Sequence, residues 1–469
     1  MKEEEFLAEE LTLEEEFLEQ KESKIRRQLI EGNIWSSIFY LALPMTLTLF
    51  LQDAFNLIDM YFVGKLGPDA LASVSMAGII VGLILAAVAG LSFGTVAMVS
   101  RYTGRGDLDL ADKVVAQSFL LGIFITLIVT VLGYIYAPQM LRLIGAEEQV
   151  VNLGTSYLRI TFGGSSTIFL TVLLFSALRG AGDPVSPMII LIISTIINII
   201  LDPIMIMGLF GFPALGVAGS ALATIIARAI ALIMLLFVMF GGKRTIKIRV
   251  KDLRPDFSIM KKIVTIGSPS SVESVIINAS ALLLMSIVAA FGTITVAAYG
   301  VGMRLNMAIM IPTMGFGTAA ATLVGQNLGA GKPKRAENSG WFCAGISSAI
   351  MLLLSLLLFS FSQEAVRIFN RDPQVIEIGS QFIRYVAPSF PFIAMAMSLG
   401  RGLNGAGDTF HTMLFSTISL LLVRIPLAWL LPRFMGIRGI WAALACTNLL
   451  YGIIVAGWFK LGKWKEKKI

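Results

Sequence analysis

Twelve long apolar stretches follow one another along this chain of 469 residues, and they restrict its fold more than any other feature. They lie near residues 34–62, 70–100, 113–137, 150–178, 186–208, 214–240, 259–290, 295–325, 337–362, 376–400, 412–432 and 436–459. Each stretch reaches or exceeds the roughly 20 residues with which an α-helix crosses about 30 Å of hydrocarbon. The sequence therefore predicts an all-α polytopic membrane protein with twelve transmembrane helices.

The composition agrees with a membrane domain and argues against several classes of function. Hydrophobic residues make up 56% of the chain and charged residues 14%, whereas a soluble domain carries about 25% charged residues. Cys343 and Cys446 both lie in apolar stretches, and His411 is the sole histidine, so the sequence contains no disulfide framework or histidine-rich metal site. We expect no cofactor and no nucleic-acid partner. The net charge of +7 comes from basic clusters in loops, where it relates to topology and to anionic lipid headgroups.

Basic residues alternate between the loops, and this alternation predicts the orientation in the membrane. The loops that follow even-numbered stretches, together with the C-terminal tail, carry most of them: Arg101, Arg105, Lys113, Arg179, Lys243, Arg244, Lys247, Arg249, Lys251, Arg254, Lys332, Lys334, Arg335 and the lysines of 460–468. The positive-inside rule places these loops and both termini in the cytoplasm. We therefore expect a multi-pass protein of the cell membrane, inner or plasma.

These boundaries divide the chain into five segments. They are a charged cytoplasmic extension (1–33), a six-helix lobe (34–240), a cytoplasmic linker (241–258), a second six-helix lobe (259–460) and a basic cytoplasmic tail (461–469). The extension contains the string EEEFL at 3–7 and again at 14–18, a spacing compatible with an amphipathic helix. We interpret the extension as a solvated segment.

The second half of the chain repeats the first. LRGAGDP at 178–184 recurs as LNGAGDT at 403–409, and Pro44 and Pro269 share the same offset of 225 residues. GLSFGTVAMVSRYTGRG at 90–106 likewise corresponds to MGFGTAAATLVGQNLGAG at 314–331. Because six stretches separate equivalent points, the two lobes enter the membrane from the same side and are related by a pseudo-two-fold axis along the membrane normal. Two such bundles can rock about a central cleft and give alternating access.

Several of these motifs together resemble the multidrug and toxic compound extrusion (MATE) family, specifically its DinF-like prokaryotic branch. The resemblance covers roughly residues 30–460 and rests on LPMTLTLFLQDAFNLIDMYFVGKLG, the paired GAGD loops, NIILDP, GVAGSALAT and LVGQNLGAGKPKRAE. It implies a V-shaped fold of two lobes and the export of small organic, often cationic, compounds driven by inward flow of H⁺ or Na⁺. We expect amphipathic substrates, contact with membrane lipid and a monomer.

Acidic residues inside apolar stretches are the first candidates for a coupling site, since a charge at the bilayer centre costs about 2.5–3.5 kcal/mol on insertion scales. The first lobe has Asp53 and Asp59 on its first stretch and Asp202 on its fifth. Asn198 precedes Asp202 by four residues, so their side chains share one helix face. Gln52 precedes Asp59 by seven and shares its face. Asp53 lies about 120° around the helix from Asp59 and is a second-rank candidate.

These side chains suit either of two coupling ions. Carboxylate and amide oxygens of Asp59, Asn198 and Asp202 suit a hard cation such as Na⁺, and Pro203 frees a carbonyl one turn earlier that can add a ligand. Two neighbouring carboxylates also disfavour double ionisation, which suits proton exchange. The resemblance places the site on the same three residues, with Tyr157 and Ser220 beside them. The alternative is that the two acids form ion pairs with Arg159 or Arg228.

The two lobes differ in these chemical groups. At the offset of 225, Leu284 takes the place of Asp59, and in STISLLLVRIP, which aligns with STIINIILDP, Arg424 takes the place of Asp202. We therefore expect the cation site in the first lobe. Glu273 is the only acid that lies well inside an apolar stretch of the second lobe, since Glu337 and Glu377 lie at the ends of theirs. It is either an ion-pair partner of Arg304, Arg384 or Arg401, or a second site for a proton or a ligand.

Two other functions remain as alternatives to multidrug efflux. The chain has no G-x-x-x-x-G-K-S/T frame and no signature of a membrane hydrolase, which argues against an ATP-driven pump and against an enzyme. A flippase for a lipid-linked saccharide shares this broad architecture and would need a cationic cleft. Arg304, Arg384, Arg401 and Arg424 can supply one. A receptor or scaffold without transport is the alternative of another class.

Overall fold

The computed structural model describes residues 24–241, 246–467 and 469. The EEEFL strings of the N-terminal extension lie outside the described residues. The first half contains a helix over residues 24–31, α2 (Ile34–Gly64), α3 (Pro68–Arg105), α4 (Leu108–Leu143), α5 (Glu148–Gly163), α6 (Ser165–Ala181), α7 (Val185–Met207) and α8 (Val217–Phe240). The second half contains α9 (Phe257–Ala289), α10 (Thr293–Gly329), α11 (Pro333–Ser360), α12 (Ser362–Arg367), α13 (Pro373–Val386), α14 (Phe390–Gly405), α15 (Thr409–Ser416), α16 (Arg424–Leu430), α17 (Pro432–Met435) and α18 (Arg438–Leu461).

The described residues contain eleven helices that are long and apolar enough to cross a membrane, or twelve if one bent pair counts as a single span. That pair is α5 and α6, which meet at Gly164 with a bend of 50°. Helices make up the fold, and no strand occurs among the described residues. The prediction of an all-α protein with twelve spans is therefore confirmed, with the fourth span broken near its middle.

The repeated GAGD motif forms the same turn in both halves. Gly182 ends α6 with φ = 93°, and Gly407 follows α14 with φ = 83°. In each turn the N–H of the next aspartate donates to the carbonyl five residues earlier, from Asp183 to Leu178 at 2.9 Å and from Asp408 to Leu403 at 2.8 Å. Glycine is favoured because residues with a side chain rarely adopt this left-handed backbone conformation. The motif recurs because both helices end in the same way.

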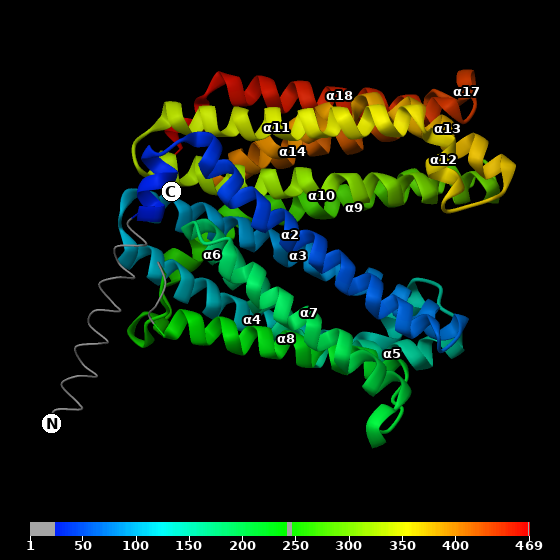
Figure 1. Cartoon of the computed structure of the whole chain (residues 1–469), viewed down its shortest axis with the longest axis horizontal. Helices are drawn as coiled ribbons and strands as arrows, with labels where there is room; N and C mark the ends of the chain where they lie inside the picture. Colours follow the sequence, from blue (N-terminus) through cyan, green and yellow to red (C-terminus); the bar gives the residue numbers. More distant parts are fainter. Residues whose placement is uncertain (1–23, 242–245, 468) are drawn as a thin grey trace.

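The helices form two bundles, α2–α8 and α9–α18, which lie against each other near the C-terminus and diverge toward the opposite end (Figure 1). The contact between them runs mainly along α3, which packs on α9 and α10, and along α2, which packs on α10. The end at which they meet contains both GAGD turns and the basic loops. Our prediction of orientation makes this the cytoplasmic end.

Glycines bring the two backbones together at this end. A Cβ on Gly104 of α3 would overlap the carbonyl of Gln326, and one on Gly325 of α10 would overlap the Ser100 hydroxyl. Hydrogen bonds also cross the junction. Gln326 Nε2 donates to the Gly180 carbonyl at 3.0 Å, and an Arg101 guanidinium nitrogen donates to the Ala406 carbonyl at 3.1 Å. The junction is closely packed, and Ser100 and Gln326 are fully buried in it.

The segment that joins the halves is bound to α4 by a buried amide. Gln117 Nε2 donates to the carbonyls of Asp252 and Arg254 at 2.7 and 2.8 Å, and its Oε1 accepts from the N–H of Asp256 at 2.8 Å. Lys113 pairs with Asp256 at 2.7 Å. This hydrogen bond holds the pKa of Asp256 below its ordinary value. Because the pKa of Asp256 is lower in the folded protein than in the unfolded chain, the pair stabilises the fold at pH values above the pKa of the unfolded chain. This stabilisation is lost as the pH falls through the pKa of Asp256 in the folded protein.

Replacing Gln117 by leucine should loosen this segment. We expect Gln117→Leu to lower the free energy of unfolding by about 1–3 kcal/mol, because three hydrogen bonds to a buried amide are lost. The measurement is the rate of proteolytic cleavage within 246–256 in detergent. Gln149→Leu, at an exposed amide with one bond to Asp69, is the matched control. Equal cleavage of the two variants would contradict the role of Gln117.

Candidate functional site

A cavity of about 600 Å³ lies inside the first bundle. Its walls come from α2, α3, α5, α6 and α8, and its lining combines apolar side chains with a few polar ones. The polar residues are Gln52, Asn56, Asp59, Ser75, Tyr157, Thr161, Thr224 and Arg228. A largely apolar cavity with a few convergent polar groups is the usual form of a small-molecule site.

Asp59 lies at the boundary between this cavity and the packed interior. It shares one face of α2 with Gln52 and Asn56, since the three are four and three residues apart and all line the cavity. Its side chain is 7% exposed, and its Oδ1 accepts a hydrogen bond of 2.5 Å from the Ser220 hydroxyl of α8. Asp59 is therefore accessible from the cavity, and a hydrogen bond from Ser220 fixes its carboxylate.

Asn198 and Asp202 form the buried part of the site on α7. Both side chains are fully buried, and Asn198 Nδ2 donates to Asp202 Oδ1 at 3.1 Å. The remaining oxygens, Asn198 Oδ1 and Asp202 Oδ2, are buried without a hydrogen-bond partner. Pro203 follows within the helix, and because proline lacks an N–H, the carbonyl of Ile199 has no helical donor. Buried polar atoms are normally satisfied, so these two oxygens, on residues one helical turn apart, are acceptors that a proton or a cation can use.

The structure brings the two carboxylates together. Asp59 and Asp202 lie close enough to interact electrostatically, and both interact with Tyr157 of α5. Among the described residues no three His, Cys, Asp or Glu side chains gather to hold a metal ion. With two carboxylates, one amide and one hydroxyl, the site has donors suited to a monovalent cation or a proton rather than to zinc.

The described part of the chain contains no basic side chain within ion-pair distance of either acid. Arg228 lies over the Phe55 ring, 4.8 Å from its centroid, and Arg159 donates to the Tyr134 carbonyl at 3.4 Å. The alternative that Asp59 or Asp202 is neutralised by Arg159 or Arg228 is thus wrong for this conformation. The acids have each other and hydrogen-bond donors as neighbours.

The other candidate site residues of the first half, Gln52 and Asp53, differ in whether they line the cavity. Gln52 lines the cavity, whereas Asp53 is exposed and lies outside it. Asn56 and Arg228 also line the cavity, although neither was predicted to do so. Asn56 was detectable from its place between Gln52 and Asp59 on one helix face, and Arg228 as the lone basic residue within the sixth apolar stretch.

In the second half the equivalent region has different chemistry. Arg424 donates to Thr447 at 2.9 Å and to Asn448 at 2.7 Å, and Leu284 is buried among apolar neighbours. Residues Thr417–Val423 form a π-helical turn here. STISLLLVRIP is one residue longer than STIINIILDP, and a π-helical turn is the form in which a helix absorbs one extra residue. The second half therefore does not reproduce the buried acid.

Glu273 of α9 has one of the three arginines named above as its charge partner. It interacts with Arg401 and hydrogen-bonds to Thr412. Arg401 also lies over the Phe93 ring of α3, 4.0 Å from its centroid, and so links the bundles. Arg384 donates instead to Ser362 at 3.0 Å, and Arg304 is exposed. Among the described residues, Arg304 makes no ion pair with Glu273.

Comparison with known proteins adds an independent line of observation. A family model described as MatE matches the chain twice, over residues 44–204 and 269–430. The probable multidrug resistance protein NorM of Thermotoga maritima is 26% identical over 451 residues, which are 95% of this chain and 94% of that protein. An FAD transporter of Shewanella oneidensis is 27% identical over 430 residues, 92% of this chain and 95% of that one. A solved multidrug resistance MATE transporter of the MOP superfamily, in an outward-facing conformation, has a TM-score of 0.86 at 24% identity, covering 92% and 97% of the two chains.

Proposed function

This chain belongs to the MatE family of membrane transporters, and from that premise we propose that it is a secondary multidrug efflux transporter that expels organic cations in exchange for H⁺ or Na⁺. It is a transporter and not an enzyme. The observation that carries the proposal is the pair of orphaned oxygens on Asn198 and Asp202, directly behind an acid that lines a cavity.

The arrangement supports competition between substrate and coupling ion. A cationic substrate in the cavity reaches Asp59 but not Asp202, which is fully buried. A proton or a small cation can be shared between Asp59 and Asp202, and it then cancels the charge that would attract the substrate. The two ligands therefore exclude each other at Asp59. Mutually exclusive binding, combined with two bundles that rock about their junction, is sufficient for antiport.

The substrate side of the cavity favours an aromatic or amphipathic cation. Tyr157 provides an aromatic ring and Asp59 provides the negative charge, whereas the Phe55 ring is already in contact with Arg228. Apolar residues of α3 and α6, including Ile79, Leu85 and Ile168, make up most of the remaining wall. Non-directional apolar walls accept varied ligands, and Asp59 and Arg228 are the two charged residues among them.

Flux under separately imposed gradients tests this function. Proteoliposomes loaded with ethidium are given either a pH jump without Na⁺ or a Na⁺ jump at constant pH, and FAD is the anionic comparison substrate because one relative is an FAD transporter. We expect gradient-driven ethidium flux and no FAD flux. Ethidium flux that neither gradient drives would contradict coupling, and an absence of all flux would favour a receptor or scaffold.

The observations support efflux over a flippase for a lipid-linked saccharide. Such a substrate needs several free cations in one cleft to bind its pyrophosphate. Arg384 and Arg424 already donate to Ser362, Thr447 and Asn448. Arg401 faces Glu273 and the Phe93 ring. Three of the four candidate arginines serve local contacts and Arg304 is exposed, which leaves a weak basis for a shared pyrophosphate site.

A further inference from the structure

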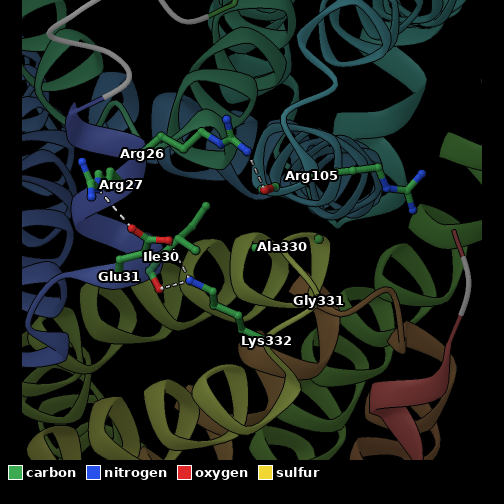
Figure 2. A pocket seen from close by; sticks show the side chains of 10 residues that line it. Arg26, Arg27, Ile30, Glu31, Arg105, Ala330, Gly331 and Lys332 are labelled. Carbon is green, nitrogen blue, oxygen red and sulfur yellow. Dashed lines mark hydrogen bonds and ion pairs between the residues drawn. The ribbon is translucent and has the colours of Figure 1, made fainter.

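A second hollow, of about 660 Å³, lies at the end where the two bundles meet (Figure 2). Three segments that are far apart in the sequence form it: the helix over residues 24–31, the end of α3 with Gly104 and Arg105, and the loop 329–332 between α10 and α11. It is remote from Asp59 and Asp202, and the transport mechanism above does not use it. It is also open toward solvent on the predicted cytoplasmic side.

Positive charge dominates this hollow. Arg26, Arg27, Arg105 and Lys332 line it, and Glu31 is its single acid. Glu31 is shared between Lys332 and Arg27, each at 3.1 Å, as Figure 2 shows. Hydrogen bonds from Lys332 and Arg27 hold the pKa of Glu31 below its ordinary value, so the carboxylate stays charged near neutral pH. One carboxylate for four cations leaves a net charge of +3 around the hollow.

Two of the four cations keep unused hydrogen-bonding capacity. Arg26 donates one guanidinium nitrogen to the Gly104 carbonyl at 3.2 Å, but its Nε is buried without a partner. Arg105 contacts the Tyr102 ring, and within the described residues it makes no hydrogen bond or ion pair. The free donors of Arg26, together with the unbalanced positive charge, favour an acceptor-rich anion in this hollow.

We propose that this hollow binds a phosphate group, with Arg26 and Lys332 as its ligands and with Arg105 adding positive charge at its rim. Guanidinium groups match the planar spacing of phosphate oxygens, and lysine adds a point charge. The hollow lies just beyond the apolar stretches that end near residues 100 and 325. An anionic phospholipid of the inner leaflet and a soluble phosphate both carry this group. The experiment below separates the two sources.

Binding here would favour one conformation of the transporter. Arg26 and Arg105 belong to the N-terminal half, and Lys332 belongs to the second. The hollow is complete only while the bundles meet at this end. A ligand that contacts both halves binds the closed arrangement better than an open one and shifts the population toward it. A phosphate group would thus stabilise the form that is closed at the predicted cytoplasmic end.

Lipid and phosphate binding to full-length protein in nanodiscs tests the proposal. The discs contain phosphatidylcholine alone or with phosphatidylglycerol or phosphatidic acid, and a second series adds inorganic phosphate to the phosphatidylcholine discs. The readout is the alkylation rate of Ser100→Cys, in a Cys446→Ser background, because Ser100 is buried in the junction and Cys343 is itself buried. The protein used keeps residues 1–23, which contain ten glutamates and two lysines. Any competition between these glutamates and the anionic ligand for the hollow is then part of the measurement.

Relative to discs of phosphatidylcholine alone, whose phosphate is neutralised by its choline, we expect anionic lipid or free phosphate to slow the alkylation of Ser100→Cys. In the triple variant R26Q/R105Q/K332Q, the ligand concentration that gives the same slowing of alkylation should rise about tenfold or more. R105Q alone should weaken it in the same direction, and since Arg105 makes no hydrogen bond within the described residues, the substitution leaves the fold intact. The control K261Q/K262Q/K463Q removes three exposed cations of the same side and should leave the effect unchanged.

Three outcomes are distinguishable. A response to the anionic lipids alone identifies a headgroup site, and a response to inorganic phosphate as well identifies a site for soluble phosphate. No response to either, or an equal response in R105Q, the triple variant and the control, would overturn the proposal. Ethidium flux driven by an ion gradient does not depend on this site, so the failure of one hypothesis leaves the other standing.

Discussion

Gradient-driven efflux should disappear in the variant Asp202→Asn, and this is the largest effect we expect from a single substitution. The amide keeps the size of the side chain and a partner for Asn198, yet it can neither take up nor release a proton and carries no charge for Na⁺. We expect the coupled rate to fall by more than about 100-fold, equivalent to about 3 kcal/mol. The same loss is expected for Asp59→Asn, which also removes the charge that faces the substrate.

The fold should survive both substitutions. A buried carboxylate without a counter-charge destabilises a protein, so replacing it by an amide is neutral or stabilising. The measurement is ethidium flux in proteoliposomes, with thermal stability measured on the same preparations. Asp53→Asn is the matched control, because Asp53 is an exposed acid on the same helix, outside the cavity. Full coupled flux in Asp202→Asn, or an equal loss in Asp53→Asn, would refute the coupling site.

Gly325→Val should trap the transporter away from the closed junction. A Cβ at Gly325 would overlap the Ser100 hydroxyl of the other bundle, and the Gly405 carbonyl lies next to it. Overpacking of this kind costs about 1–3 kcal/mol. A penalty near 3 kcal/mol on the closed form alone lowers its population relative to the open form by about 100-fold.

Two readouts distinguish trapping from misfolding. We expect coupled ethidium flux to fall in Gly325→Val and the alkylation of a reporter cysteine at Ser100 to accelerate, while the protein remains folded in detergent. Gly300→Val is the control on the same helix, since nothing lies within 4 Å of a Cβ built at Gly300. If both glycine variants transport like the wild type, the junction does not need to close as tightly as the structure indicates.

The general plan of the fold was predictable because it depends on local properties of the sequence. Each apolar stretch is long enough to cross the bilayer as a helix whatever its neighbours do. The GAGD repeat encodes two equal turns by placing glycine where a left-handed backbone is needed. The 50° bend between α5 and α6 at Gly164 was not predicted, although the run Gly163-Gly164-Ser165-Ser166 is a local signal for a kink.

The candidate site was predictable in part, for a related reason. Acids inside apolar stretches are rare enough to mark Asp59 and Asp202, and a spacing of four residues on one helix is enough to pair Asn198 with Asp202. Which arginine approaches Glu273 was not predictable, since Arg304, Arg384 and Arg401 lie on different helices. Helix packing selects Arg401 and also brings Phe93 of the other bundle onto it.

The sequence by itself determined the number of spans, the duplication and the chemical asymmetry of the halves, since each depends on residue type and spacing along one segment. Only the tertiary structure decided that Ser220 supports Asp59, that no arginine of the described chain neutralises the two acids, and that Arg26, Arg105 and Lys332 surround one hollow. Those relations join residues that lie far apart in the sequence. Their distances follow from how the helices pack, and no local pattern encodes them.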